Sequence, residues 1–422
     1  MIISFSIGNF RSFREVQTFN LAATNKKPRY SFQNDSVVPI VGGISGLKVK
    51  VAYGANGSGK SNLLMGLATF VTICKKSISE KKILKKVVPF LLDGESQDKP
   101  TFFELEFDHE EVVYRYGFEV DQEKFHSEWL FARSGAEENM YFEREGNDVI
   151  FNDEVFPEGE KINQSLNPKI DALDKDDLFL SLGVIRKSNV LTSVMAGISK
   201  ITVVGGVIDE HIRDLAQDAL KDPQARKLTL KFLRQIGIKV DSIIHPEHED
   251  DQELLKEAKA DIGELGESKI IFAHAYFNKK SKQKEFYGWP VKEMESAGTQ
   301  RLVLLAPFII SAILKGEVLV IDEFEARLHT TLSRAIIEMF IEPDSNPNHA
   351  QLIVATHDTN LLSSNLLRRD QVAFVQRNEE GASEIFSLSD IKYVRNDASH
   401  EKDYLSGLYE AVPNIERLIV SE

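Results

Sequence analysis

The sequence contains little that would place the protein outside the cell or in a membrane. Cys74 is the only cysteine among 422 residues, so an intrachain disulfide is impossible and a reducing compartment is favoured. The first residues, MIISFSIGNFRSF, lack the basic segment of a signal peptide. No apolar run has the length of a membrane span, and the longest, 302–314, fits a buried helix. We therefore expect a cytoplasmic protein without a membrane partner.

The sequence also has fewer basic than acidic residues. The chain has 51 Lys and Arg against 65 Asp and Glu, which gives a formal net charge of −14. Proteins that coat DNA along an extended surface are usually basic, so the composition argues against that class but allows a local basic groove. Internal repeats, low-complexity tracts and sustained heptads are missing as well. What remains is an ordinary globular composition and enough sequence for about two or three domains.

The stretch 51–61, VAYGANGSGKS, is the strongest motif in the chain. It fits G-x-x-x-x-G-K-[ST], with an apolar strand predicted before it (47–53) and an apolar helix after it (62–74). Backbone N–H groups and the helix N-terminus of such a loop form an anion cradle. The alternative is a glycine-rich turn before a core helix. We predict that the motif is a P-loop that binds ATP with Mg²⁺ through Gly54, Asn56, Gly57, Gly59, Lys60, Ser61 and Asn62.

Individual roles follow from the chemistry of phosphate binding. Lys60 is predicted to reach the β- and γ-phosphates, and the Ser61 hydroxyl to be a ligand of Mg²⁺. Downstream, the apolar run 318–321 ends in Asp322 and Glu323. Ligands of α/β sheets bind at the carboxyl ends of strands, so we predict that Asp322 holds Mg²⁺ and that Glu323 polarises the attacking water. Together with the P-loop, this pair predicts ATP hydrolysis.

Helical and extended patterns alternate after Pro290, which predicts a parallel sheet. The predicted elements are helix 299–315, strand 317–321, helix 330–341, strand 351–355, helix 358–367 and strand 372–376. Five segments within 100–157 alternate as antiparallel strands, and the ranges 178–196 and 209–237 have helical periodicity. We therefore divide the chain into an N-terminal half of the nucleotide-binding unit (1–157), a mostly helical insertion (158–290) and a C-terminal half (291–422).

Residues 295–301, ESAGTQR, stand directly before the predicted helix 299–315, where Ser296 can act as the N-cap. Here the chain resembles the ABC-type ATPases, in which a Ser-x-Gly-x-Gln signature precedes the Walker B strand. Ser296, Gly298 and Gln300 match, whereas Thr299 replaces the usual second glycine and Glu295 the usual apolar residue. An ordinary helix cap is the alternative. The resemblance implies that the signature of one subunit caps the γ-phosphate held by the P-loop of another.

The resemblance implies two further positions in the ATP site. His357 follows the predicted strand 351–355, 35 residues after Asp322, and resembles the ABC switch histidine that contacts the γ-phosphate. A structural histidine is the alternative. The family also has a glutamine loop that supplies a metal ligand before the antiparallel strands. Gln97 is the only glutamine in that interval and is assigned to this role, although it lies in the polar loop DGESQDKP.

Other motifs indicate the branch of the family. The segment 9–13, NFRSF, is similar to the N-terminal motif of RecF, SMC-like and OLD-type ATPases, which makes Arg11 and Ser12 predicted nucleotide contacts. Four further stretches resemble the compact AAA/ABC-hybrid ATPases of prokaryotic phage defence, which include RloA, AbiL-type proteins and the ATPase of the PARIS system. These stretches are PFLLD (89–93), YRYGF (114–118), ESAGTQR (295–301) and the tail YLSG (404–407) with Val412-Pro413.

The resemblance implies an ABC-type P-loop ATPase of the α/β class. Its expected parts are a parallel core sheet, an antiparallel β region and a mostly helical insertion between the Walker A loop and the signature. It also implies a sensor that assembles with itself and controls a separate, nuclease-like effector from a neighbouring gene in abortive infection, with a phage protein as trigger. The residues after His357 lack the Asp-x-Asp of OLD nucleases, so we expect no nuclease activity in this chain. The alternative is a RecF- or SMC-like ATP-dependent DNA-binding repair module.

Two lysine-rich stretches, 75–86 and 279–284, are candidate surfaces for DNA or a partner. The stretch 279–284 lies between two predicted strands, 270–277 and 285–289, and a solvated hairpin tip is the preferred interpretation. For 75–86, which is predicted to be helical, a binding surface and a solvated helix face both remain open.

Overall fold

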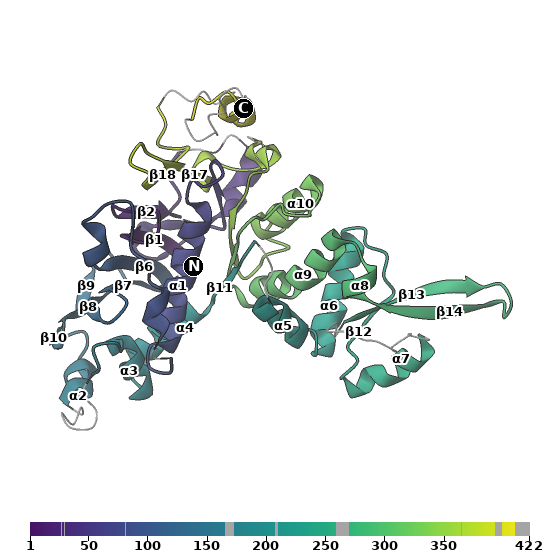
Figure 1. Cartoon of the computed structure of the whole chain (residues 1–422), viewed down its shortest axis with the longest axis horizontal. Coiled ribbons are helices and arrows are strands. Elements are labelled where there is room, and N and C mark those ends of the chain that lie inside the picture. Colours follow the sequence, from purple (N-terminus) through teal and green to yellow (C-terminus); the bar gives the residue numbers. More distant parts are fainter. Residues whose placement is uncertain are drawn as a thin grey trace, which may run out of the picture.

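A mixed α/β architecture with two main sheets organises the protein, as the computed structural model shows (Figure 1). One lobe contains the antiparallel sheet, and the other is mostly helical and carries a projecting β-hairpin. The structure describes residues 1–26, 28, 30–80, 82–164, 173–206, 210–258, 270–363, 365–392 and 399–409. The tail motif Val412-Pro413 lies outside the described residues.

The six-stranded sheet has the order β11-β15-β16-β5-β17-β18. Its strands are β5 (Val49–Tyr53), β11 (Ile201–Val204), β15 (Val318–Ile321), β16 (Gln351–Ala355), β17 (Val372–Arg377) and β18 (Ser383–Ser387). Only β18 is antiparallel to its neighbour, so the predicted parallel sheet is confirmed. Every residue of β5, β15 and β16 is buried, as expected for strands covered on both faces. The carboxyl ends of these three strands therefore meet at one edge.

The antiparallel sheet has seven strands in the order β10-β9-β8-β7-β6-β1-β2. They are β1 (Ile2–Gly8), β2 (Gln17–Asn20), β6 (Thr101–His109), β7 (Val112–Val120), β8 (Phe125–Arg133), β9 (Asn139–Glu145) and β10 (Asp148–Phe151). The antiparallel region predicted over 100–157 is confirmed, and β1 and β2 extend it at one edge. β6 alternates between buried and half-buried residues, because one face of the strand packs on the core.

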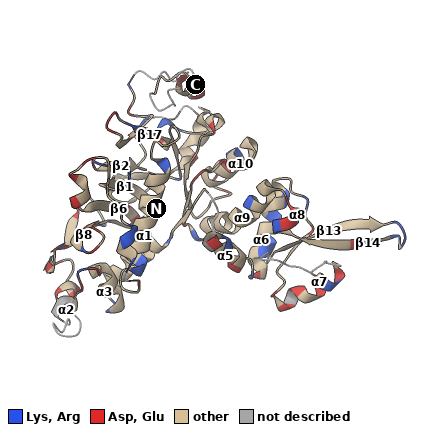
Figure 2. Ribbon diagram, viewed as in Figure 1, with Lys and Arg blue, Asp and Glu red and all other residues tan. Residues whose placement is uncertain are grey.

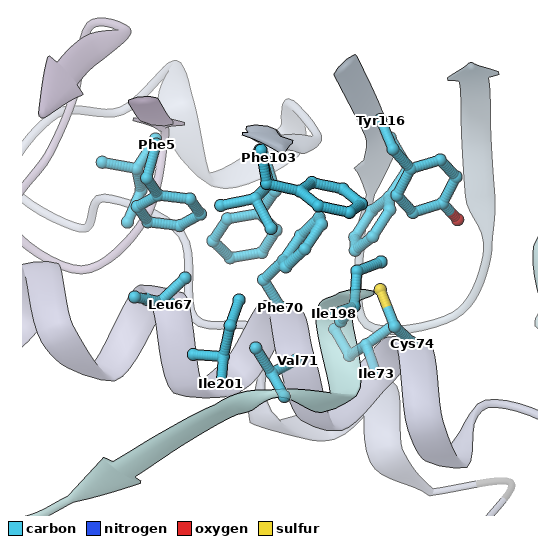
Figure 3. Close-up of a cluster of buried hydrophobic side chains, with 14 of the residues drawn as sticks. Phe5, Leu67, Phe70, Val71, Ile73, Cys74, Phe103, Tyr116, Ile198 and Ile201 are labelled. Atoms are coloured by element: carbon cyan, nitrogen blue, oxygen red, sulfur yellow. The ribbon is translucent and has the colours of Figure 1, made fainter. Parts of the chain in front are cut away.

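Helix α1 (Lys60–Lys76) joins the two sheets in one apolar core. Its Phe70 ring stacks on Phe118 of β7, with 5.2 Å between the ring centroids. Figure 3 shows Phe70 among the buried side chains of this core, together with Phe103 and Tyr116. The helix predicted over 75–86 is wrong: α1 ends at Lys76, and only the 3₁₀ turn η3 (Ile83–Lys86) follows. The Ser79 hydroxyl donates to Lys76 O, and such a local bond competes with helix continuation.

Helices α2 (Glu158–Gln164), α3 (Phe179–Ile185) and α4 (Asn189–Ser199) follow the antiparallel strands. The range 178–196 was predicted as one helix, but it breaks because Lys187 has a φ of 60° and Ser188 caps α4. The range 209–237 likewise forms α5 (Glu210–Ala219) and α6 (Pro223–Gln235), with Asp222 as the N-cap of the second helix.

The second lobe is built around α9 (Ala297–Lys315), which packs against α5, α6 and β15. Among the described helices, α9 alone is long and apolar enough to cross a membrane. Val303, Leu305 and Ile309 of α9 are fully buried in the protein core, so this apolar surface is used for packing. Helix α10 (Thr330–Ile341) has the predicted bounds.

A third sheet joins β12 (Ser242–Ile244), β13 (Ile271–Asn278) and β14 (Gln283–Pro290), and the predicted strand pair is β13–β14. Helices α7 (Gln252–Glu257) and α8 (Val291–Met294) flank it. The range 158–290, predicted as one insertion, is divided: α2–α4 lie with the antiparallel lobe, β11 joins the parallel sheet, and the elements from α5 to β14 belong to the second lobe.

The remaining elements are short. They are β3 (Val37–Pro39), β4 (Ser45–Leu47), α11 (His400–Leu405) and the 3₁₀ turns η1 (Ser31–Ser36), η2 (Val41–Gly43), η4 (Ser96–Asp98), η5 (Glu249–Asp251), η6 (Thr359–Leu362) and η7 (Arg369–Gln371). The helix predicted over 358–367 is reduced to η6, because the Asp358 carboxylate binds the Asn360 N–H and favours a turn.

Candidate functional site

A pocket of about 390 Å³ opens at the carboxyl ends of β5, β15 and β16. Each of these strands continues into a loop whose polar residues line the pocket. The lining residues are Asn56, Gly57, Gly59, Lys60, Ser61, Asn62, Asp322, Glu323, Ala355, Thr356 and His357. The structure therefore brings together the predicted P-loop residues, the two carboxylates and the histidine.

The P-loop depends on a left-handed residue where α1 begins. Gly59 is the N-cap of α1 and has a φ of 114°. A Cβ atom at this position would lie 2.2 Å from Ser383 Oγ and 2.8 Å from Ser12 Oγ, so a larger residue does not fit. This geometry directs the first N–H groups of α1 into the pocket, where they favour an anion.

A cluster of hydroxyl groups supports the loop from behind. Ser12 is 3 % exposed, and its Oγ accepts a hydrogen bond from Asn62 Nδ2 at 2.8 Å. Ser383 Oγ lies 2.8 Å from Ser12 Oγ and 2.6 Å from Ser58 O. Ser12 was predicted as a nucleotide contact, but it is not among the residues that line the pocket. In this structure it positions Asn62 and the loop.

Arg11 lies outside the pocket lining as well. Its backbone has a φ of 51°, its N–H donates to Val88 O at 2.8 Å, and its guanidinium lies 5.7 Å from the centre of the Phe10 ring. The neighbouring Phe10 and Phe13 are fully buried in the core. A nucleotide contact by Arg11 remains a prediction.

The Lys60 ammonium is folded back onto the P-loop. Its Nζ donates to Gly54 O at 2.8 Å and to Ala55 O at 3.0 Å. Burial lowers the pKa of Lys60 to about 8, although Asp322, Glu325 and Glu323 act in the opposite direction. The lysine thus stands among carboxylates in a poorly hydrated site, where a phosphate group would compete for its protons.

Oxygen donors for a metal face the same pocket. Ser61 is the second residue of α1, and Asp322 directly follows β15. A hydroxyl and a carboxylate are hard oxygen ligands of the kind that Mg²⁺ uses beside phosphates. The donor set therefore fits a magnesium ion bound with a nucleotide.

Glu323 is held in a special backbone conformation, with a φ of 46° and an exposed side chain. Its carbonyl accepts a hydrogen bond from Arg301 Nη2 at 2.8 Å, and Arg301 Nη1 donates to Gly206 O at 2.6 Å. Arg301 is only 6 % exposed, and burial lowers its pKa. No role was predicted for Arg301 from the sequence. The signal that could have identified it is its position as a charged residue near the start of an apolar helix.

Glu325 is a second residue that the sequence analysis missed. Its carboxylate accepts hydrogen bonds from Thr356 Oγ1 at 2.6 Å and from the His357 N–H at 2.8 Å. It therefore ties the loop after β15 to the end of β16. The third acidic residue of the run Asp-Glu-Phe-Glu was the signal that could have identified it.

His357 is exposed at the pocket, and its pKa is lowered by burial and by the Lys60 charge. The imidazole is therefore neutral near pH 7 and can either donate or accept a proton. Its backbone is fixed through Glu325, while its ring is left for a ligand on the β16 side of the pocket.

The ESAGTQR turn lies outside the pocket lining. Ser296 is exposed and caps α9, with its Oγ accepting from the Thr299 N–H at 3.2 Å. A Cβ atom on Gly298 would lie 2.6 Å from Arg327 O, so this turn packs against the loop after β15. Gln300 Nε2 donates to Lys292 O at 2.7 Å and Glu295 O at 2.9 Å. The predicted signature is thus a formed, exposed turn.

Gln97 is not brought to the predicted metal ligands. It is exposed in η4, and its Nε2 lies 3.4 Å from both Leu91 O and Asp93 O. It is not among the residues that line the pocket. The loop is instead closed by Asp93, whose carboxylate accepts from the Ser96 N–H and hydroxyl.

The tail residue Tyr404 contacts the P-loop directly. The Gly54 N–H donates to its phenol oxygen, while burial raises the pKa of Tyr404. The Tyr404 ring stacks on Phe374 of β17, with 5.6 Å between the centroids. The YLSG motif of the tail therefore has a physical role, because it places an acceptor beneath the first glycine of the loop.

A protein-family model described as "AAA domain, putative AbiEii toxin, Type IV TA system" matches residues 52–363. The match spans 312 of the 422 residues and includes the whole pocket lining together with residues 295–301. No curated protein matches the chain.

Proposed function

The chain belongs to the family of AAA domains that this model describes, and from that premise we propose that it is an ATP-hydrolysing regulator of a separate toxic effector in antiphage defence. One observation carries the proposal: a P-loop lysine, two carboxylates and a histidine converge on one pocket at the edge of the parallel sheet. The family description connects the domain with toxin–antitoxin and abortive-infection systems.

In this proposal, different groups of the chain bind the phosphates and the metal ion. The N–H groups at the start of α1 and the Lys60 ammonium bind the phosphates, which requires Lys60 to leave the carbonyls of Gly54 and Ala55. Ser61 and Asp322 would hold Mg²⁺, which supplies positive charge beside the phosphates when bound. Tyr404 and the Ser12 cluster keep the loop in shape from behind.

Hydrolysis needs an oriented water molecule. Glu323 accepts a proton from this water as general base, and Arg301 fixes the Glu323 backbone so that its carboxylate stays at the pocket. His357, held through Glu325, donates a hydrogen bond to the γ-phosphate oxygens. The proposed catalysis therefore consists of positioning and electrostatics.

We further propose an ABC-type arrangement, in which the signature of a second copy completes the site. Ser296 is exposed and the Gly298 turn is already formed, so the N-terminus of α9 is available to a phosphate held by another subunit. Assembly and nucleotide state are then coupled, and a nuclease-like effector encoded nearby responds to the assembled form. A phage protein would act as the trigger.

The test of this function uses Glu323→Gln, which keeps the size of the side chain and removes the general base. We expect phosphate release to fall by about 10²- to 10⁴-fold while ATP binding persists. We also expect the variant to accumulate as an ATP-dependent oligomer in light scattering. The matched control is Glu342→Gln, which follows α10 outside the pocket lining. Hydrolysis by Glu323→Gln at the wild-type rate would refute the catalytic assignment.

The effector is tested separately by co-purification. The tagged chain and its neighbouring gene product are expressed together, with wild-type chain and with Lys60→Ala. A complex that forms only with a nucleotide-competent chain supports regulation through ATP. A toxic neighbour that acts equally with either chain contradicts it.

A further inference from the structure

The β13–β14 hairpin projects from the second lobe and carries a basic tip (Figures 1 and 2). Lys279, Lys280, Lys282 and Lys284 lie within six residues, and no acidic residue lies among them. Lys284 lies 4.0 Å from the Asp241 carboxylate. Within the described part of the chain, Lys279, Lys280 and Lys282 have no ion-pair partner. The tip therefore presents positive charge that the fold does not neutralise.

Aromatic side chains are exposed directly behind the lysines. Phe277 is 66 % exposed, Tyr287 42 % and Tyr276 38 %. Phe277 pairs with Lys284 across the strands, so these two residues share one face of the hairpin. Tyr276 and Tyr287 lie on the opposite face, because their cross-strand partners are Glu285 and His274.

The part of the hairpin nearest the lobe packs through residues other than these exposed aromatic side chains. Phe272 and Ala273 of β13 are buried in the lobe, and Gly288 of β14 is buried opposite Ala273. Farther out, Phe277 has two thirds of its surface exposed, so the fold buries little of this ring. Exposed aromatic residues beside unneutralised charge mark a binding surface.

We propose that the outer half of the β13–β14 hairpin, which carries Tyr276, Phe277, Tyr287 and the lysines between them, binds single-stranded nucleic acid. Lysines bind the phosphates without regard to sequence, and exposed aromatic rings stack on unpaired bases. A stable protein partner usually buries about 800 Å² on each side, which is more than a two-stranded tip offers. A duplex would satisfy the lysines but would leave Phe277 without a base to stack on.

The hairpin is also connected to the signature turn. Trp289 Nε1 of β14 donates to Glu295 Oε1 at 2.8 Å, and Glu295 directly precedes Ser296. Gln300 of α9 holds the Glu295 carbonyl at 2.9 Å. A strand bound at its tip can thus change the position of the signature turn. This step, unlike the binding itself, rests on the proposed function.

The binding test uses the full chain, a fluorescein-labelled 20-mer of single-stranded DNA and anisotropy at about 50 mM salt. The variant Lys279→Gln/Lys280→Gln/Lys282→Gln should bind at least about tenfold more weakly, with the salt slope reduced by about 2. The matched control is Lys82→Gln/Lys85→Gln/Lys86→Gln, which removes the same charge from the other lysine-rich stretch. It should bind like the wild type. Equal losses in both triple variants would overturn the proposal.

Phe277→Ala separates single strands from duplexes. We expect this variant to lose about fivefold or more in affinity for the single strand. Wild-type affinity in Phe277→Ala, or a duplex bound as tightly as the single strand, contradicts stacking. No binding of either form at about 50 mM salt overturns the proposal in favour of a protein partner.

Trp289→Phe tests the connection to the signature. Phenylalanine keeps most of the packing and removes the N–H that binds Glu295. The oligonucleotide affinity should stay at the wild-type value, while the change in ATP hydrolysis caused by the oligonucleotide should be lost. Stimulation that persists in Trp289→Phe contradicts the coupling and leaves the binding result standing. If the wild-type chain binds the oligonucleotide but hydrolyses no ATP, the proposed function is refuted and the binding proposal stands.

Discussion

The P-loop pocket and the signature turn use their polar groups in opposite ways. In the pocket, Lys60 is buried and held by its own loop, and Asp322 and Glu323 line the same pocket from the loop after β15. In the signature, Ser296 is exposed and the Gln300 amide is occupied by two local carbonyls. One region is a lined pocket and the other is a formed surface turn.

This difference indicates how the proposed site would be completed. The pocket contains the groups that are proposed to bind phosphates and a metal, and the ESAGTQR residues of the same chain are not among those that line it. The signature contains the N-terminus of α9, where Ser296 is exposed. Arg301 follows the signature in α9 and contacts the carbonyl of Glu323 in the same chain. In the proposed assembly, a subunit would transmit contact at its signature to its own Glu323 loop through Arg301.

Among variants outside the pocket lining, the largest effect on catalysis should come from Arg301→Gln, which removes this connection. The variant loses hydrogen bonds to the carbonyls of Gly206 and Glu323, so the catalytic carboxylate is no longer positioned. We expect kcat to fall by about 10- to 100-fold, since charged hydrogen bonds contribute about 1.5–3 kcal/mol each. The affinity of the P-loop for ATP should change by less than about twofold.

Two controls separate positioning from folding. Arg301→Lys keeps the charge and should restore part of kcat, whereas Arg334→Gln on α10 should behave like the wild type. Circular dichroism of all variants checks that the fold is intact. Equal losses in kcat and ATP affinity for Arg301→Gln would show a structural role rather than a positioning one.

The next effect contrasts two glycines of the same loop. Gly59→Ala places a Cβ atom against Ser383 and Ser12, and we expect a loss of about 2–3 kcal/mol in the free energy of unfolding. Gly57 also has a positive φ, 77°, but a Cβ atom there meets nothing within 4 Å. Gly57→Ala should therefore cost only about 1 kcal/mol. Urea unfolding without nucleotide measures both, and equal costs would contradict the packing argument.

The pH dependence of ATP binding tests the burial of Lys60. Its pKa is about 8 in this pocket and 10.5 in an ordinary environment. Between these values the unfolded chain binds a proton that the folded chain lacks, so the Lys60 contribution to stability rises with pH. Bound phosphate favours the charged lysine, so ATP binding takes up a proton above pH 8.

We therefore expect ATP affinity to fall by up to about tenfold per pH unit above pH 8. Calorimetry in two buffers of different ionisation enthalpy measures the proton uptake directly. Lys75→Gln, at the other end of α1, should show the same uptake as the wild type. An affinity that is flat between pH 7 and pH 9.5 would contradict the assignment.

The smallest effect should come from Tyr404→Phe. The variant removes the oxygen that accepts the Gly54 N–H and keeps the aromatic stack on Phe374. A lost neutral hydrogen bond predicts ATP binding about two- to tenfold weaker. Tyr409→Phe is the matched control, because its hydroxyl contacts Asp403 and not the loop. Equal changes in ATP affinity for both variants would exclude a specific role of Tyr404.

The structure brings Lys60, Asp322 and His357 to one pocket, and the sequence predicted this proximity for a physical reason. Lys60, Asp322 and His357 each follow a buried apolar strand, and parallel strands deliver such residues to one edge. The missed residues, Arg301 and Glu325, act through side-chain directions that a linear pattern does not define. Both bind backbone atoms of neighbouring loops, which exist only after folding.

Gln97 and Ser12 lie outside the pocket lining, and the reasons differ from those for the missed residues. Gln97 was assigned by its place in the chain order, and an interval in the sequence says nothing about where a polar loop folds. Ser12 was correctly placed near the P-loop but on the wrong side of it, because the N-terminal motif packs behind Asn62. The hairpin tip was predicted as a solvated turn, and the exposure of Phe277 is what changed that interpretation.

The central claim is that two copies share each ATP site, and mixing two inactive variants tests it most directly. Lys60→Ala removes the phosphate-binding lysine, and Ser296→Arg blocks the signature while leaving the pocket intact. Each variant alone should hydrolyse almost no ATP. In an equal mixture, half of the dimers combine the two variants and have one intact site, so activity should recover to about a quarter of the wild-type rate. A mixture as inactive as its components would contradict the shared site.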